Sequence, residues 1–493
     1  WAALGGAAAL IAVGIGFLAW RGIAEKPAAR AEGPHAIAVM PFLDMSAGGD
    51  HGYFSDGVTE EILNKLSQAE NLRVISRTSS FALRNETLDI PGIAKRLDVD
   101  YVLEGSVRRA GGRVRITAQL IDASTNSHVW SQTYDRALDD LFAVQDEIAA
   151  SVATAMQVTL AGNAPGGRMP PDIDAYEHYL HGRFLYNRRS PGDIGRARSQ
   201  LEKAVEIDPG FARAWAALAG VYSLETGEMD VAAAAPLREL QGEAARKAVE
   251  LDPGLAVAHA RLAQYFWQSR RTREGNEQMR IASTLDPNDP LVLGFSASSA
   301  IWKGDYARAA ATWRQVVTLD PLSPVSRANL GNMLEINGKL EEALAEKRRA
   351  KELSPDMGPQ LECEIARLLT ALGRHDEAAA TIDGMPKGPD RDYALALTHR
   401  APGKQQEADA ALARLAAAPR DVPVVIYLAE VYADRGRKDE AFELLDSYYR
   451  QLERERDLRP RALWSFQDEI RLSPYLKSLQ SDPRWAQVAK IPG

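Results

Sequence analysis

A tripeptide recurs at a fixed interval in the middle of the chain. Leu-Asp-Pro at 251–253 returns at 285–287 and 319–321, and as Leu-Ser-Pro at 353–355, so each interval is 34 residues. A fixed period of about 20 to 50 residues indicates supersecondary units that stack on one another. This feature constrains the fold most, because stacked units form an elongated array in which each unit contacts its neighbours.

Between the prolines, apolar residues have the spacing of a helix. In one unit His259, Leu262, Ala263 and Phe266 lie three and four positions apart, which places them on one helical face. The proline then ends a second helix, because it cannot continue the helix and restricts the residue before it. Small residues such as Gly331 allow the two helices of a unit to approach closely. The sequence therefore predicts repeated helix pairs.

This pattern resembles the tetratricopeptide family, whose motif has a large residue, Leu-Gly, Tyr, Ala and a final Pro. Trp215, Leu218, Ala219 and Tyr222 match its first half, and a late unit has Leu428, Ala429, Tyr432, Gly436 and Ala441. The resemblance implies an α-solenoid over 173–457 of about seven units, with 384–421 degenerate. We expect capping helices over 458–493, since such arrays need a cover for their last apolar face.

Residues 1–20 are apolar and carry no charge. As a helix they would span about 30 Å, the hydrocarbon thickness of a bilayer. Trp1 and Trp20 stand at the two ends, where interfacial aromatic residues are expected. We expect a transmembrane helix over 1–21 that contacts the membrane through 1–20, then a linker over 22–34. A cleaved signal peptide with an A-x-A site at 29–31 is the alternative.

An α/β segment follows. Apolar and alternating runs predict strands, amphipathic runs predict helices, and Gly111-Gly112 predicts a two-residue hairpin turn. The expected strands are 36–42, 72–76, 101–108, 113–121 and 127–134, and the expected helices are 56–66, 93–97 and 138–158.

The stretches IAVMPF, GYFSDGVTEEI, LRVISRTSSFALR, YVLEGSVRRAGGRVRITAQLIDA, HVWSQTYDR and LFAVQDEIA resemble the TolB-like amino-terminal domain of bacterial envelope and signalling proteins. The resemblance implies a small α/β domain over 35–160 without a catalytic centre. A Gly/Pro linker follows at 161–172. Relatives of this architecture commonly carry a class III nucleotide cyclase or a winged-helix domain upstream of a membrane helix.

Composition and motifs argue against several function classes. The net charge of −8 argues against binding of nucleic acid. The single cysteine excludes a Cys-rich zinc site. No phosphate loop, nucleophile elbow or H-E-x-x-H motif is present. We therefore expect no catalytic residues, metal or cofactor in this chain. Two weak metal hypotheses, at His178/His181 and at Asp44/Asp50/His51/Asp56, are each less favoured than ordinary polar surface.

A peptide groove is the functional surface that the repeat resemblance implies. First-helix residues that do not pack on the second helix would line it, and mixed polar and aromatic groups suit an extended protein or peptide ligand. The amides Asn329 and Asn332 only partly match a carboxylate clamp, without its lysines, so chaperone-tail binding is not expected. The predicted groove residues are Arg183, Tyr186, Arg261, Gln264, Trp267, Asn329, Asn332 and Glu335.

Together these features predict a membrane-anchored, non-enzymatic interaction or sensor scaffold that relays partner binding to an upstream effector. The alternatives are the regulatory portion of a class III adenylate/guanylate cyclase and the sensor portion of a winged-helix regulator. A homodimer is possible, since both classes work as dimers. We expect a single-pass bacterial inner-membrane protein with periplasmic C-terminal domains; basic residues after the apolar run favour the cytoplasmic alternative.

Overall fold

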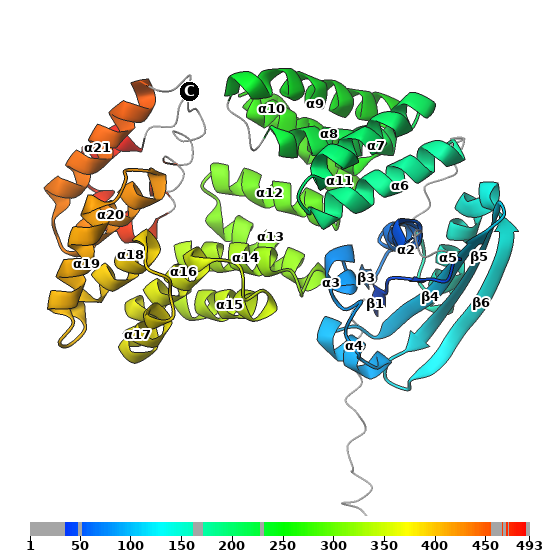
Figure 1. Ribbon diagram of the computed structural model, residues 1–493, viewed down its shortest axis with the longest axis horizontal. Helices are drawn as coiled ribbons and strands as arrows, with labels where there is room; N and C mark the ends of the chain where they lie inside the picture. Colours follow the sequence, from blue (N-terminus) through cyan, green and yellow to red (C-terminus); the bar gives the residue numbers. More distant parts are fainter. Residues whose placement is uncertain are drawn as a thin grey trace, which may run out of the picture.

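The computed structural model describes residues 35–47, 52–160, 171–226, 231–454, 466, 470–471 and 473–489. Within them an α/β domain is followed by an array of paired helices (Figure 1). The strands of the domain are β1 (His35–Val39), β2 (Leu43–Asp44), β3 (Leu72–Val74), β4 (Tyr101–Ala110), β5 (Arg113–Asp122) and β6 (Ser127–Ala137). Its helices are α2 (Gly52–Leu66), α3 (Arg77–Ala82), α4 (Ile90–Leu97), η1 (Leu138–Asp140) and α5 (Leu141–Ala155).

The six described strands form one mixed sheet. Its order is β3-β1-β4-β5-β6, with β2 paired to β4. Strand β1 runs parallel to β3 and β4, whereas β4, β5 and β6 are antiparallel. Gly111 and Gly112 join β4 to β5 with φ of 56° and 76°, which confirms the predicted two-residue turn. The five predicted strands are also confirmed; β2, of two residues, is too short for its pattern to predict.

Helices cover both faces of the sheet. Ile37 and Val39 of β1 face a core shared with α2 and α5, and Ala36 and Ala38 face a core shared with α3 and α4. Because β1 is buried on both sides, its sequence is a continuous apolar run instead of an alternating one.

Helices α6 to α21 form the array. Consecutive helices pack in pairs, and pairs stack on their neighbours, which confirms the predicted solenoid. Helices also run through 384–421, as α18 and α19. The pairs are α6 (Ile173–Arg188) with α7 (Asp193–Ile207), α8 (Ala212–Glu225) with α9 (Val231–Leu251), α10 (Ala256–Gln268) with α11 (Thr272–Leu285), α12 (Pro290–Trp302) with α13 (Tyr306–Leu319), α14 (Pro324–Ile336) with α15 (Leu340–Leu353), α16 (Pro359–Ala371) with α17 (His375–Asp383), α18 (Pro389–Leu397) with α19 (Gln405–Ala417), and α20 (Val422–Asp434) with α21 (Lys438–Arg454). Three short elements complete the described chain: η2 (Thr398–Arg400), η3 (Pro474–Leu479) and α23 (Trp485–Val488).

Small residues allow the helices of a pair to approach. A Cβ atom added to Gly182 would lie 2.7 Å from Leu201 Cγ of the paired helix, and one added to Gly331 would lie 2.8 Å from Lys347 Cγ. Both distances are too short for carbon atoms. The small residues of the repeat are therefore required by packing, as the sequence predicts.

The structure corrects the predicted membrane architecture. Among the described residues, no helix is both long and apolar enough to cross a bilayer. The helix α9, of 21 residues, is long enough, but charged side chains such as Arg238 and Glu243 occur along it. Residues 1–21, on which the predicted span rests, lie outside the described residues. The fold class is corrected to a mixed α/β domain and a helical solenoid, with neither a membrane span nor a membrane location assigned.

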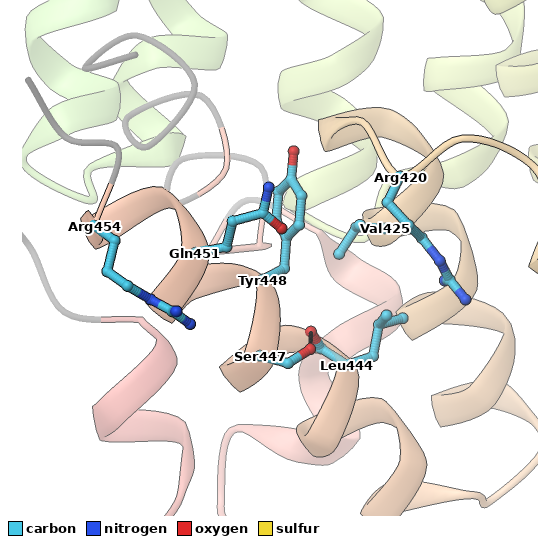
Figure 2. A pocket seen from close by; sticks show the side chains of 7 residues that line it. All are labelled: Arg420, Val425, Leu444, Ser447, Tyr448, Gln451 and Arg454. Atoms are coloured by element: carbon cyan, nitrogen blue, oxygen red, sulfur yellow. Dashed lines mark hydrogen bonds between the residues drawn. The ribbon is translucent and has the colours of Figure 1, made fainter. Parts of the chain in front are cut away.

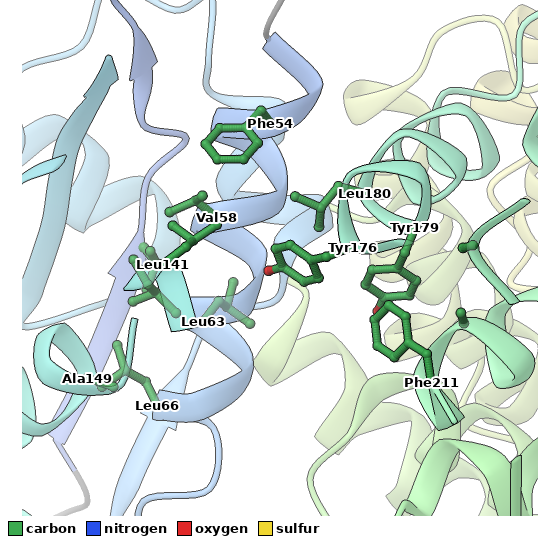
Figure 3. Packing of buried hydrophobic residues seen from close by; sticks show 14 of the residues in the cluster. Phe54, Val58, Leu63, Leu66, Leu141, Ala149, Tyr176, Tyr179, Leu180 and Phe211 are labelled. Atoms are coloured by element: carbon green, nitrogen blue, oxygen red, sulfur yellow. The ribbon is translucent and has the colours of Figure 1, made fainter. Parts of the chain in front are cut away.

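The α/β domain shares a core with the first helix of the array. Tyr176 and Leu180 of α6 pack against the buried face of α2, where Phe54 and Val58 lie (Figure 3). A Cβ atom at Gly57 of α2 would lie 2.5 Å from Leu180 Cδ2, so the two helices touch there. Moving the domain away from the array would expose this apolar surface to water.

A second contact lies far from the first along the chain. The carboxylate of Asp320, at the turn between α13 and α14, accepts hydrogen bonds from Ser76 Oγ and Ser79 Oγ at 2.5 Å each. The Ser79 hydroxyl in turn accepts from Leu322 N at 2.9 Å. Leu322 also enters the core under α3 and α4. The domain is thus fixed to the array at α6 and at the turn that begins α14.

We predict that Asp320→Ala weakens this second contact. The substitution leaves two buried serine hydroxyls without their acceptor, which costs about 1–3 kcal/mol. The measurement is urea unfolding followed by separate probes in the domain and in the array. Asp286→Ala is the matched control, because Asp286 occupies the equivalent repeat position but binds only the backbone of its own turn. The domain and array transitions should separate in the first variant only; coincident transitions in both would contradict the contact's role.

The same carboxylate predicts a pH dependence. Burial raises the pKa of Asp320 above its usual 3.8, although Ser76 and Ser79 favour the ionised form. A raised pKa in the folded state means that the carboxyl stabilises most below the unfolded pKa, and that this contribution falls as pH rises through the folded pKa. The unfolding free energy of Asp320→Asn relative to wild type should therefore increase from pH 4 upward and then level off. A difference that decreases with pH would contradict this assignment.

Candidate functional site

One position of the first helices recurs through the array, and in five of the pairs it carries a charged or amide side chain. It is the residue after the small packing residue, and we call the surface made by these side chains and their neighbours one turn earlier or later the inner face. The position is occupied by Arg183 in α6, Gln264 in α10, Asn332 in α14, Arg367 in α16 and Glu430 in α20. Charged and amide groups thus recur at a position where a solenoid commonly presents its binding surface.

At the amino-terminal end, the inner face is tied to the α/β domain. Arg183 forms an ion pair with Glu60 of α2. Arg261 of α10 donates to Tyr186 Oη at 3.1 Å and to Gln264 Oε1 at 3.2 Å. Burial alone would raise the pKa of the Tyr186 phenol, but the charge and hydrogen bond of Arg261 bring it below its usual value. The first pairs therefore present an arginine–tyrosine network partly covered by α2.

Two other predicted groove residues differ in environment. Trp267 is buried, lies edge-on to Trp302 at 4.9 Å, and would contact a Cβ atom at Gly275 of its own second helix at 2.5 Å. It is therefore a packing residue between α10, α11 and α12. Asn329 is half-buried on α14.

At the carboxyl-terminal end, Arg367 stands between two buried carboxylates. Its guanidinium lies 2.9 Å from Glu335 Oε1 of α14 and 3.7 Å from Glu430 Oε2 of α20. Glu335 and Glu430 are each 2% exposed. Lys347, fully buried, bonds to Asn332 and lies 3.7 Å from Glu335 Oε2. The arginine thus links three helix pairs through charge-assisted contacts.

Burial governs the electrostatics of this cluster. Burial raises the pKa of Glu430, although Arg367, Ser473 and Tyr393 each favour its ionised form. Burial alone would lower the pKa of Arg367, but Glu335 and its other neighbours raise it well above its usual range. The guanidinium therefore stays charged, and it is what keeps two carboxylates tolerable in a buried place.

A segment from the end of the chain lies on this cluster. Tyr475 Oη donates to Glu335 Oε1 at 2.8 Å, and Ser473 Oγ donates to Glu430 Oε1 at 2.6 Å. The Arg367 guanidinium lies over the Tyr475 ring, 4.6 Å from its centre. A bound segment thus already occupies the inner face of α14, α16 and α20.

The eight predicted groove residues therefore do not form one site. Arg183, Tyr186, Arg261 and Gln264 gather at one end; Asn332 and Glu335 belong to the cluster around Arg367. Sequence reasoning missed Arg367 and Glu430, although they follow Ala366 and Ala429 as Asn332 follows Gly331. Applying one register to every unit would have found them. No periodic pattern points to Tyr475.

The metal hypotheses find no support among the described residues, where no group of three or more His, Cys, Asp or Glu side chains could hold an ion. The His178 Nδ1 atom lies 2.7 Å from Gln200 Oε1, and His181 stacks on Tyr53. Asp56 pairs with Arg84. Asp44 Oδ1 accepts a hydrogen bond from Ser46 N, and Asp50 and His51 lie outside the described residues.

A pocket of about 580 Å³ is lined by residues of α20 and α21 and by Arg420, which precedes α20 (Figure 2). Its lining mixes apolar and basic groups without a convergent set of reactive side chains. It supports no chemical role. The lining residues are Arg420, Val425, Leu444, Ser447, Tyr448, Gln451 and Arg454.

We predict that Arg367→Met destabilises the chain by about 3–5 kcal/mol, because it leaves buried Glu430 without its cation and leaves Glu335 paired with Lys347 alone. Urea unfolding at neutral pH measures the loss. The matched control is Arg374→Met, whose ion pair with Glu377 is exposed, so that its loss should be much smaller. Equal losses in the two variants would contradict the central role of Arg367.

Two family models match parts of the chain. Residues 34–151 match the second domain of HilA/YgeH-like transcriptional regulators, and residues 296–357 match the tetratricopeptide repeat. The predicted TolB-like assignment is therefore not supported: the model that matches the α/β region is a different one. The predicted repeats are confirmed.

The chain is also similar to a curated relative. It is 42% identical over 199 residues, 40% of this chain, to a protein of Rhizobium meliloti (strain 1021) named "Putative adenylate cyclase 3". The matched region spans 34% of that relative's length.

Solved structures of repeat proteins show distant likeness. Pseudomonas aeruginosa pilF is 22% identical, with 48% of this chain and 97% of that one covered and a TM-score of 0.36. The human IFIT1 dimer with m7Gppp-AAAA is 17% identical, with 62% and 77% covered and a TM-score of 0.39. Similarity this low carries no functional argument, and nothing among these matches supports the predicted membrane contact or homodimer. The chain carries tetratricopeptide repeats joined to a mixed α/β domain and is similar over part of its length to a protein named as an adenylate cyclase.

Proposed function

We propose that this chain is a non-catalytic interaction module whose repeats bind a protein partner on the inner face. Tetratricopeptide repeats are typical of protein–protein interaction scaffolds. The observation that supports the proposal most is that residues 473–477 already lie across α14, α16 and α20, bound through Glu335 and Glu430. Polar and aromatic groups at the other end, around Arg261, offer a second stretch of the same surface.

We further propose that partner binding is relayed through the α/β domain. The domain contacts the array at α6 and at the turn before α14, so both ends of a four-pair stretch touch the same domain. A partner that changes the curvature of this stretch would strain one of the two contacts. An output domain attached to the α/β domain would sense that strain.

Two outputs have a specific observation in their favour. Similarity to the Rhizobium meliloti protein favours a regulatory portion of an adenylate cyclase. The match of residues 34–151 to HilA/YgeH-like regulators favours a portion of a transcriptional regulator. We place the cyclase first, because its match is a direct identity of 42% over 199 residues.

A photo-crosslinking experiment tests partner binding. Benzoylphenylalanine at Gln264 or Asn329, on the inner face, should crosslink to a specific protein in cells. The matched controls carry the probe at Glu277 or Glu352, exposed residues on second helices. Crosslinked partners identified by mass spectrometry should appear from the inner positions only. Equal yields from both faces would contradict the proposal.

The non-catalytic assignment has its own test. Purified chain covering 35–493 should neither convert ATP or GTP to a cyclic product nor hold duplex DNA at moderate salt. Chromatography of the nucleotide and a filter-binding assay measure the two activities. Turnover, or DNA retention that depends on salt as phosphate contacts do, would overturn the assignment.

A further inference from the structure

The carboxylates of the inner face outnumber the cations that reach them. Glu335, Glu364 and Glu430 face only Lys347 and Arg367 within the cluster. The remaining hydrogen-bonding capacity of Glu335 and Glu430 is met by hydroxyl groups, two of which come from residues 473–475. Buried carboxylates need such donors, because an unsatisfied charged acceptor in a buried place is costly.

The segment that supplies these donors is not a further repeat. It is the six-residue 3₁₀ helix η3, which begins at Pro474 with Ser473 as its cap. One side carries Leu476 and Leu479, both fully buried against α20 and α21. The other side carries Tyr475, which reaches Glu335, 140 positions earlier in the chain. It therefore binds as a short peptide would, with apolar anchors on one side and hydroxyl donors on the other.

We propose that residues 473–479 are an internal ligand of the inner face, which a partner segment with the same chemistry displaces. This inference rests on the proposed function and names the partner: a segment without acidic residues that has a small hydroxyl residue, a tyrosine two positions later and apolar residues beyond it. The tyrosine ring would stack under Arg367 and its hydroxyl would bind Glu335. A phosphorylated tyrosine would be rejected, because its charge would meet two buried carboxylates.

The test uses the full chain and a fluorescent peptide with the sequence of residues 473–481, SPYLKSLQS. In Tyr475→Phe the internal segment keeps its ring but loses the hydroxyl bond to Glu335. A bond to a charged acceptor corresponds to roughly tenfold in the equilibrium. The site is then free more often, so fluorescence anisotropy should show the peptide binding up to about tenfold more tightly than to wild type.

Matched peptides and variants identify the site. A peptide with phosphotyrosine, or with Phe in place of Tyr and Ala in place of the first Ser, should bind at least about tenfold more weakly. Adding Glu335→Gln to Tyr475→Phe should also weaken peptide binding. Circular dichroism establishes that each variant is folded, and Tyr475→Phe keeps its volume, so that a loss of fold is not expected.

Two results would overturn the proposal: equal peptide affinity for wild type and Tyr475→Phe, or binding unchanged by Glu335→Gln. Crosslinking from Gln264 distinguishes failure of the internal-ligand proposal from failure of the proposed partner-binding function. Partner capture at Gln264 with no peptide competition would leave the interaction function standing and remove the internal ligand. Loss of both would remove the interaction function itself.

Discussion

The packing of α2 on α6 determines where the rest of the molecule lies. Phe54 and Val58 share one apolar core with Tyr176 and Leu180, and Gly57 lets the two helix surfaces touch. Because the first helix of the array completes the core of the α/β domain, the two parts cannot separate without exposing apolar surface. The bond of Asp320 to α3 adds a second point of attachment further along the array. The array is therefore held by the domain along its first four pairs, and Leu353 of α15 in the fifth pair also packs against the core under α3 and α4.

Buried charge distinguishes the two ends of the inner face. At the domain end, arginines pair with acidic residues of α2, so the α/β domain itself supplies the acceptors. At the other end, Arg367 pairs with Glu335 and Glu430, and hydroxyl groups of residues 473–475 donate further hydrogen bonds to these two carboxylates. Paired buried charges fix the positions of side chains more than they stabilise the fold, since the cost of their desolvation offsets much of their attraction. They make a surface that accepts hydroxyl donors in fixed places.

Patterns of residues close in sequence predict the helices and strands, but they do not predict contacts between residues far apart in the chain. The alternation around Gly111-Gly112 and the 34-residue period each depend on residues close in sequence, so strands and helix pairs could be predicted. Within the site, the repeat position after each small residue predicts Arg183, Gln264 and Asn332. The same position in α16 would also have predicted Arg367. The contact of Tyr475 with Glu335 joins residues 140 positions apart and leaves no periodic trace. Apolar composition alone likewise led to the membrane assignment that the structure does not support.

Hydrogen–deuterium exchange of the unmodified chain tests the central claim most directly, that residues 473–479 are a reversible ligand of the inner face. Exchange reports local opening separately from global unfolding. The account predicts that the amides of η3 exchange well before those of α20, because only side-chain contacts hold the segment to Glu335, Arg367 and Glu430. Exchange of η3 together with the core of α20, at the rate of global unfolding, would show that the segment is a permanent part of the fold and would contradict the account.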